Sequence, residues 1–255
     1  LGAGALLHRL VIQETGDPVT ARRSVRLFAL FPPAFVLVLA YSEALYVFLA
    51  IAVILALRAR QWWAAAALAY LAGLTRPVAG LLALPAAVHA WRAGATRRPA
   101  ALASIIAAPL GTATFLIWAG IALDDWRAPI DRQRELRGDA TEPISRWFRG
   151  LGRALDGDEG ELFHILAASV ILILALVTIR RLALDLVVYT VPSAVILVSA
   201  ENLNSLERYA LAAFPLVIAA ALVSRDEHFD RWLPTASAVG LASLTTLTLN
   251  GGYVP

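Results

Sequence analysis

An uncharged apolar stretch, LFHILAASVILILALVTI, occupies residues 162–179 of this 255-residue chain. A run of about 20 such residues lets an α-helix cross the hydrocarbon core of a bilayer. The apolar residues are consecutive rather than alternating, which disfavours a barrel strand, and a helix satisfies its own backbone hydrogen bonds in hydrocarbon. We therefore predict that this stretch is a membrane-spanning helix.

Similar apolar stretches occur on both sides of it. They cover residues 1–12, 24–40, 43–57, 62–75, 77–91, 99–121, 182–200, 209–223 and 232–249. The chain is 59% hydrophobic and 16% charged, with a mean hydropathy of +0.69, outside the range of ordinary soluble domains. The sequence predicts an all-α polytopic membrane protein with a bundle of about nine transmembrane helices. It argues against a soluble enzyme, a disordered chain and a nucleic-acid-binding protein.

The predicted bundle divides into three parts. These are an N-terminal transmembrane bundle, an extracytoplasmic loop and a C-terminal transmembrane bundle, at residues 1–121, 122–161 and 162–255. Because the chain begins at Leu1 and its first apolar stretch is short, we expect an incomplete first span and a missing N-terminal segment. Within the loop, residues 144–155 (ISRWFRGLGRAL) carry apolar residues at helical spacing. This pattern predicts a short interfacial helix with Trp147 and Phe148 in the headgroup region, either as simple anchors or with a further role.

Arginine clusters indicate which ends of the helices face the cytoplasm. All 22 basic residues are arginine, and short loops rich in arginine stay on the cytoplasmic side. Five junctions are of this kind: Arg22, Arg23 and Arg26; Arg58 and Arg60; Arg92, Arg97 and Arg98; Arg180 and Arg181; Arg225 and Arg231. Following the helices in order places all five on one side of the membrane. The extracytoplasmic side then receives residues 41–43, 75–77, 124–161 and 201–208.

Charged residues on the extracytoplasmic side are functional candidates, because a charged side chain close to the membrane interior is costly. The first is Glu43, which follows Ser42 at the start of an apolar stretch. In one interpretation Ser42 caps a helix and Glu43 complements the dipole of that helix. In the other, the Glu43 carboxylate faces a polar cavity, where it orients a substrate hydroxyl or takes its proton.

Two further candidates lie on the same side. Arg76 separates two apolar stretches in the sequence GLTRP, residues 73–77, and its guanidinium either snorkels to the outer headgroups or binds a phosphate in bidentate geometry. The polar patch ENLNSLERY, residues 201–209, contains Glu207 and Arg208, which either pair with each other at an interface or take part in binding. The convergence of these candidates on one membrane face favours a site there.

The sequence contains no pattern typical of a metal or cofactor site. Cysteine is absent, and residues 156–160 (DGDEG) lack the EF-hand pattern. No glycine-rich phosphate loop is present. Four histidines without metal-ligand spacing are expected to be packed or interfacial: His8, His89, His164 and His228. We therefore assign no metal ligand and no cofactor.

Short motifs occur in a characteristic order along the chain. They are Phe31-Pro32, Tyr41-Ser42-Glu43, Thr75-Arg76, and Arg208-Tyr209 followed by Phe214-Pro215. In order and spacing these motifs, which cover most of residues 20–220, resemble the PIG-V family of GPI mannosyltransferases and their bacterial relatives. Members of that family are polytopic glycosyltransferases of the GT-C type, so the resemblance implies a GT-C-like helix bundle.

The resemblance implies transfer of mannose from a polyprenyl-phosphate donor, similar to dolichyl-phosphate mannose, to an extracytoplasmic lipid, glycan or protein acceptor. Arg76, and secondarily Arg208, would stabilise the charge on the leaving phosphate, and Glu43 would orient or deprotonate the acceptor or position the arginine. Neutral hydrogen bonds to the substrates are expected from Tyr41, Ser42, Thr75, Asn204 and Tyr209. The family also implies a catalytic base in its first extracytoplasmic loop, which we expect upstream of Leu1.

Other functions stay open from the sequence. A transporter or flippase also carries polar clusters at broken helices, although here the clusters gather toward one face and no inverted repeat is evident. A non-catalytic subunit could hold a lipid substrate for a partner, and an enzyme of this type could use another sugar on polyprenyl phosphate. The arginine-rich, lysine-free composition suggests a bacterial plasma membrane. The expected partners are the lipid bilayer, the donor and the acceptor, with no nucleic acid.

Overall fold

The computed structural model describes residues 1–39, 41–138, 141–203, 206–224 and 227–251. Within these ranges the secondary structure consists of 13 α-helices and two 3₁₀ helices, with no β-strand. The prediction of an all-α fold is confirmed.

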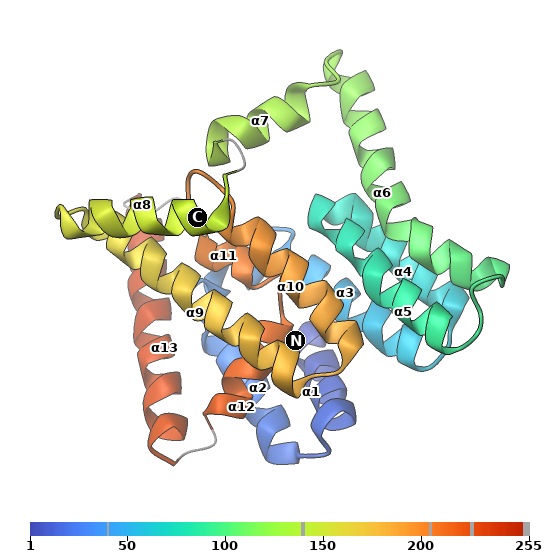
Figure 1. Cartoon of the computed structure of the whole chain (residues 1–255), viewed down its shortest axis with the longest axis horizontal. Helices are drawn as coiled ribbons and strands as arrows, with labels where there is room; N and C mark the ends of the chain where they lie inside the picture. The colour runs from blue at the N-terminus through green and yellow to red at the C-terminus, as the bar shows by residue number, and fades with distance from the viewer. Residues whose placement is uncertain (40, 139–140, 204–205, 225–226, 252–255) are drawn as a thin grey trace.

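The N-terminal half contains α1 to α6 and both 3₁₀ helices (Figure 1). Their bounds are α1 Gly2–Thr15, α2 Pro18–Leu30, η1 Ala34–Leu37, α3 Glu43–Arg58, α4 Trp62–Thr75, η2 Pro77–Leu82, α5 Ala83–Arg92 and α6 Pro99–Leu123. Asp17 begins α2 by accepting hydrogen bonds from the backbone N–H groups of Val19 and Thr20, which satisfies donors that the first helical turn leaves open. Pro77 ends α4, because proline disfavours helical backbone in the residue before it.

Helices α4 and α6 pack in close contact through glycine. A Cβ atom added to Gly73 would lie 2.2 Å from the carbonyl oxygen of Ala108, and one added to Gly111 would lie 2.2 Å from that of Tyr70. Small residues of this kind let two helix backbones approach closely. Since α4 ends at Thr75, this contact determines where the next residue, Arg76, is held.

The C-terminal half contains α7 to α13. Their bounds are α7 Ala128–Arg137, α8 Pro143–Leu155, α9 Glu159–Arg181, α10 Leu184–Val198, α11 Leu206–Ala210, α12 Pro215–Val223 and α13 Glu227–Leu249. In Figure 1, α7 connects the end of α6 to α8, and α8 lies across the end of α9. Most of the buried apolar side chains form two clusters, a larger one built mainly from α1 to α6, α10 and α12, and a smaller one built from α9 to α12. Helices α3 and α11, which carry the candidate residues, belong to different clusters.

The predicted loop helix is present as α8. Glu142 caps it, and hydrogen bonds from the backbone N–H groups of Ser145 and Ile144 hold the pKa of the Glu142 carboxyl below its usual value. Phe148 is 63% exposed, as expected for a headgroup residue. Trp147 instead turns toward α9, where its indole N–H donates to the Ser169 hydroxyl over 2.9 Å.

Among the described residues, fewer helices are long and apolar enough to cross a membrane than the sequence predicted. Among the described residues two helices are long and apolar enough to cross a bilayer, α6 and residues 160–181 of α9. Helix α3 has 16 residues and α4 has 14, so at 1.5 Å per residue they extend about 21 to 24 Å against a hydrocarbon core of about 30 Å. The prediction of about nine full spans is therefore not supported.

Breaks in the predicted stretches explain this difference. The stretch 24–40 contains the end of α2 at Leu30, a turn through Pro32 and Pro33, and then η1. The stretch 209–223 becomes helical again only at Pro215, where α12 begins. Apolar composition alone does not distinguish a continuous helix from a broken one, because proline-containing turns can be as hydrophobic as the helices beside them.

Candidate functional site

Three segments that are far apart in the sequence meet at the carboxylate of Glu43. Glu43 is the first residue of α3 and is completely buried. Its Oε1 atom lies 2.9 Å from Nη2 of Arg76 and 3.3 Å from Nε of Arg208. Three of the four charged residues singled out from the sequence therefore form one ionic cluster around a buried carboxylate.

Local backbone structure positions each member of this cluster. Arg76 has extended backbone angles, φ −153° and ψ 139°, in the break between α4 and η2. Arg208 lies within the short helix α11. The Ser42 side chain makes no capping hydrogen bond to α3, so that part of the helix-cap interpretation of Ser42 and Glu43 is wrong.

Two tyrosines enclose the guanidinium groups. The Tyr209 ring lies 5.1 Å from Cζ of Arg76 and 4.5 Å from Cζ of Arg208, and the Tyr41 ring lies 5.2 Å from Cζ of Arg208. Arg208 also donates from Nη2 to the Tyr209 hydroxyl over 2.7 Å. Cations over aromatic faces at such distances are stabilised electrostatically, so Tyr41 and Tyr209 help to hold the two arginines.

Within the described ranges, Arg76 keeps an unsatisfied donor in this cluster. One carboxylate, that of Glu43, faces both guanidinium groups. Among the described residues, Nη1 of Arg76 and Oε2 of Glu43 are buried without a hydrogen-bond partner. A buried charge without full compensation is costly. An anionic ligand next to Arg76 would supply the missing compensation.

The position of Glu43 also bears on its predicted role. A carboxylate whose oxygen already faces two guanidinium groups, at the bottom of a buried cluster, holds those groups in place. It is poorly placed to accept a proton as well, since two neighbouring cations disfavour protonation of a carboxylate. The geometry favours Glu43 as a positioning residue over Glu43 as a proton acceptor.

Thr75 and Ser42 have no described contact with the charged groups of the cluster. The Thr75 hydroxyl donates to the carbonyl of Ala72 in its own helix over 2.7 Å. Ser42 is exposed and has no described contact with the charged groups. Asn204 lies outside the described residues.

Glu207 and Arg208 do not pair with each other. Arg208 contacts Glu43, whereas Oε1 of Glu207 lies 3.3 Å from Nδ1 of His164 in α9. His164 was expected to be an ordinary packed or interfacial histidine, and the structure places it against a buried carboxylate beside the site. From the sequence, the one signal for the contact between His164 and Glu207 was that both residues lie at the predicted extracytoplasmic ends of their helices.

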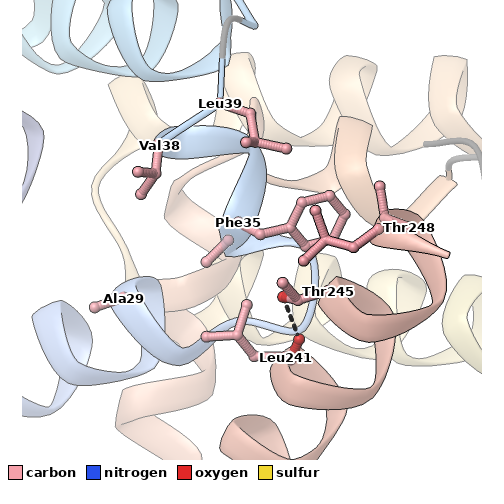
Figure 2. Close-up of a pocket in the computed structure, with 9 residues that line it drawn as sticks. Ala29, Phe35, Val38, Leu39, Leu241, Thr245 and Thr248 are labelled. Atoms are coloured by element: carbon pink, nitrogen blue, oxygen red, sulfur yellow. Dashed lines mark hydrogen bonds between the residues drawn. The ribbon is translucent and has the colours of Figure 1, made fainter.

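An apolar cavity of about 340 Å³ lies beside the segment that leads to Glu43 (Figure 2). It is lined by Ala29, Ala34, Phe35, Val38, Leu39, Leu241, Thr245, Thr248 and Leu249. Figure 2 shows α13 on one side and η1 with the residues after it on the other. The Thr245 and Thr248 hydroxyls donate to carbonyls of their own helix, so they are satisfied within α13.

This cavity is connected with the ionic cluster through the backbone. Val38, which is 88% exposed, and Leu39 form part of its wall. The carbonyl of Leu39 accepts a hydrogen bond from the backbone N–H of Tyr41 over 2.7 Å, and the Tyr41 ring faces Arg208. One wall residue of the cavity is thus hydrogen-bonded to a residue that contacts the ionic cluster.

A second buried ionic cluster lies at the opposite end of α3. Arg58 donates to Asp185 over 2.8 Å and also binds Glu14, and Nε2 of His89 lies 3.0 Å from Asp185. From the sequence we interpreted Arg58 only as a marker of the cytoplasmic side, whereas here it contacts Glu14 of α1 and Asp185 of α10. The expectation that buried charges gather toward one face alone is thus incomplete.

Within the described ranges, no group of three or more His, Cys, Asp or Glu side chains is placed to hold a metal ion. The ionic site is therefore built from carboxylate, guanidinium and phenol groups. In comparisons with known proteins, no family model, no curated protein and no solved structure matches this chain.

Proposed function

We propose that this protein is a multi-pass membrane glycosyltransferase that transfers mannose from a polyprenyl-phosphate donor to an extracytoplasmic lipid, glycan or protein acceptor. The observation that carries the proposal is the buried contact of Arg76 and Arg208 with a single carboxylate, that of Glu43. Among the residues that the structure describes, Nη1 of Arg76 is buried there without a hydrogen-bond partner, and guanidinium groups bind phosphate well. The order of motifs around these residues supports the same function.

In the proposed reaction an acceptor hydroxyl attacks the anomeric carbon of the donor while the bond to the lipid phosphate breaks. Negative charge on the departing phosphate grows as that bond lengthens. Arginines that are already held in place by Glu43 stabilise this charge without reorganisation, so they lower the barrier more than they strengthen ground-state binding. The stacked rings of Tyr41 and Tyr209 keep the guanidinium groups oriented.

The apolar cavity supplies a place for the hydrocarbon part of the donor. Its volume of about 340 Å³ lies in the usual range for ligand cavities. Its threonine hydroxyls are already bonded within α13, which suits an isoprenoid chain. Leu39 in the cavity wall accepts a hydrogen bond from Tyr41, whose ring faces the Arg208 guanidinium.

The membrane setting is part of the proposal. Large apolar side chains are exposed along α6 and α9, among them Ile106, Ile117, Trp118, Leu166 and Ile173, and exposed apolar surface of this extent is typical of a membrane or protein interface. We place the shorter helices in the bilayer too, because interruptions of helices are tolerated there when protein buries them. At the break between α4 and η2, the Arg76 side chain is 14% exposed.

The test uses the purified full chain in lipid nanodiscs, with radiolabelled polyprenyl-phosphate mannose as donor and octyl mannoside or water as acceptor. We expect the wild-type protein to consume the donor. Arg76→Ala should lower the rate by about 100-fold or more, the usual effect of losing a group that stabilises transition-state charge. Arg132→Ala, which removes an exposed arginine on α7, is the matched control and should leave the rate unchanged. Wild-type turnover by Arg76→Ala would contradict the phosphate role.

A lipid transporter or flippase is the second candidate, and a specific observation favours it. Buried ionic clusters lie at both ends of α3, and between them the Tyr46 and Tyr189 hydroxyls meet at 2.8 Å. Polar groups at several depths are typical of transport proteins. Movement of a fluorescent polyprenyl phosphate across proteoliposome membranes without any sugar transfer would support this function instead.

A further inference from the structure

We propose that Glu207 is the group that takes the proton from the acceptor hydroxyl, and that His164 positions it. This inference rests on the proposed glycosyltransferase function and adds the proton acceptor that the ionic cluster itself does not supply. The motif order did not assign this role to Glu207, and the sequence assigned no function to His164.

The geometry around Glu207 differs from that around Glu43. Glu207 is 6% exposed, and among the described residues its Oε2 atom is buried without a hydrogen-bond partner. Its Oε1 atom lies 3.3 Å from Nδ1 of His164, a contact in which a protonated Nδ1 would donate to the carboxylate. One oxygen is thus held by a neighbour and the other is left for a donor such as a hydroxyl.

Glu207 and Arg208 are consecutive residues of α11, so the carboxylate and the proposed anion site lie on the same short helix but on different sides of it. Successive residues of a helix leave the axis about 100° apart, and accordingly Arg208 contacts Glu43 while Glu207 contacts α9. A donor phosphate at Arg208 and an acceptor at Glu207 would therefore approach the same short helix from different directions. This is the arrangement that a transfer between two substrates requires.

The comparison with Glu43 decides between the two buried carboxylates. Glu43 faces two guanidinium groups and stabilises them. Glu207 faces an imidazole, and no described residue places a guanidinium against it. A carboxylate that is not already committed to two cations is the better proton acceptor.

The chemical step is balanced as follows. The acceptor O–H proton moves to Oε2 of Glu207 as the acceptor oxygen forms a bond to the anomeric carbon. The bond from that carbon to the phosphate oxygen breaks, and its electron pair leaves with the lipid phosphate, which the arginines hold. The products are the glycosylated acceptor, the lipid phosphate and a protonated Glu207, which later releases its proton to water.

The experiment measures turnover and donor binding separately in nanodiscs, with the same radiolabelled donor and with octyl mannoside or water as acceptor. Glu207→Gln should lower kcat by about 100-fold or more, the contribution expected from a general base. It should bind the non-transferable probe polyprenyl phosphate with wild-type affinity. Glu207→Ala should regain activity when sodium formate is added, because a free carboxylate can enter the vacated space. Glu135→Gln, an exposed carboxylate on α7, is the control and should match the wild type.

The outcomes separate this inference from the proposed function. Wild-type turnover in Glu207→Gln, with Arg76→Ala inactive, overturns the role of Glu207 and leaves the transferase. Loss of polyprenyl-phosphate binding in Glu207→Gln, or no rescue by formate, shows that Glu207 only maintains the structure and also overturns it. If the wild-type protein consumes no donor, the proposed function fails and this inference fails with it. His164→Gln should lower kcat with little change in donor affinity, as expected for a residue that acts through Glu207.

Discussion

The close contact of α4 and α6 makes Gly111→Ala an informative substitution. The added Cβ would lie 2.2 Å from the Tyr70 carbonyl oxygen, about 1.2 Å short of the 3.4 Å at which ordinary contacts begin. The Tyr70 carbonyl oxygen is a backbone atom, so no side-chain rotation relieves the clash and the two helices must move apart by about 1 Å. Overpacking of this kind costs about 1 to 3 kcal/mol of the free energy of unfolding.

The movement should also reach the ionic site. Helix α4 ends one residue before Arg76, so a shift of α4 changes the distance between Arg76 and Glu43, now 2.9 Å. A displacement of about 1 Å is enough to weaken a positioned catalytic contact. Gly111→Ala should therefore lower both the stability of the fold and the affinity for polyprenyl phosphate.

The assay is thermal unfolding in nanodiscs, followed by tryptophan fluorescence, together with polyprenyl-phosphate binding. At about 2 to 4 °C per kcal/mol for a chain of this size, we expect Tm to fall by about 2 to 12 °C. Gly152→Ala is the matched control, because a Cβ there meets no atom within 4 Å and alanine favours the helix. If Gly111→Ala unfolds at the same temperature as Gly152→Ala, the helices are not in the close contact described and the reasoning is refuted.

Three further predictions concern other parts of the molecule. Asp185→Asn, which removes one of the two carboxylates that Arg58 contacts, should destabilise the protein by about 1 to 3 kcal/mol, and an unchanged Tm would contradict a stabilising role for this contact. The hydrogen bond from Arg23 lowers the pKa of Asp230. This link between α2 and α13 therefore stabilises the protein fully above the ordinary carboxyl pKa of about 4, and the stabilisation is lost as the pH falls through the lowered pKa. The acid-induced drop in Tm should be smaller in Asp230→Asn than in the wild type, and equal drops would contradict this role of Asp230. Thr248→Phe should reduce the volume of the apolar cavity and weaken binding of polyprenyl phosphate without weakening binding of inorganic phosphate, whereas equal effects on both probes would show that the cavity does not hold the chain.

Several elements follow from local sequence patterns. The stretches 43–57 and 62–75 predicted from apolar composition correspond closely to α3 at Glu43–Arg58 and α4 at Trp62–Thr75. The loop helix predicted at 144–155 is α8 at Pro143–Leu155. These predictions succeed because helix formation and termination depend on neighbouring residues: apolar runs, a proline that disfavours helix before it, and caps.

The sequence by itself determined that the chain is helical and apolar, and it identified Glu43, Arg76 and Arg208 as charges that composition does not explain. Only the tertiary structure decided that Arg208 pairs with Glu43 and that Glu207 instead faces His164. It also decided that α13 meets η1 around an apolar cavity. The physical reason is that an ionic partner or a cavity wall is chosen by packing between distant helices, and no local propensity or periodicity encodes which of several arginines, carboxylates or apolar faces will meet.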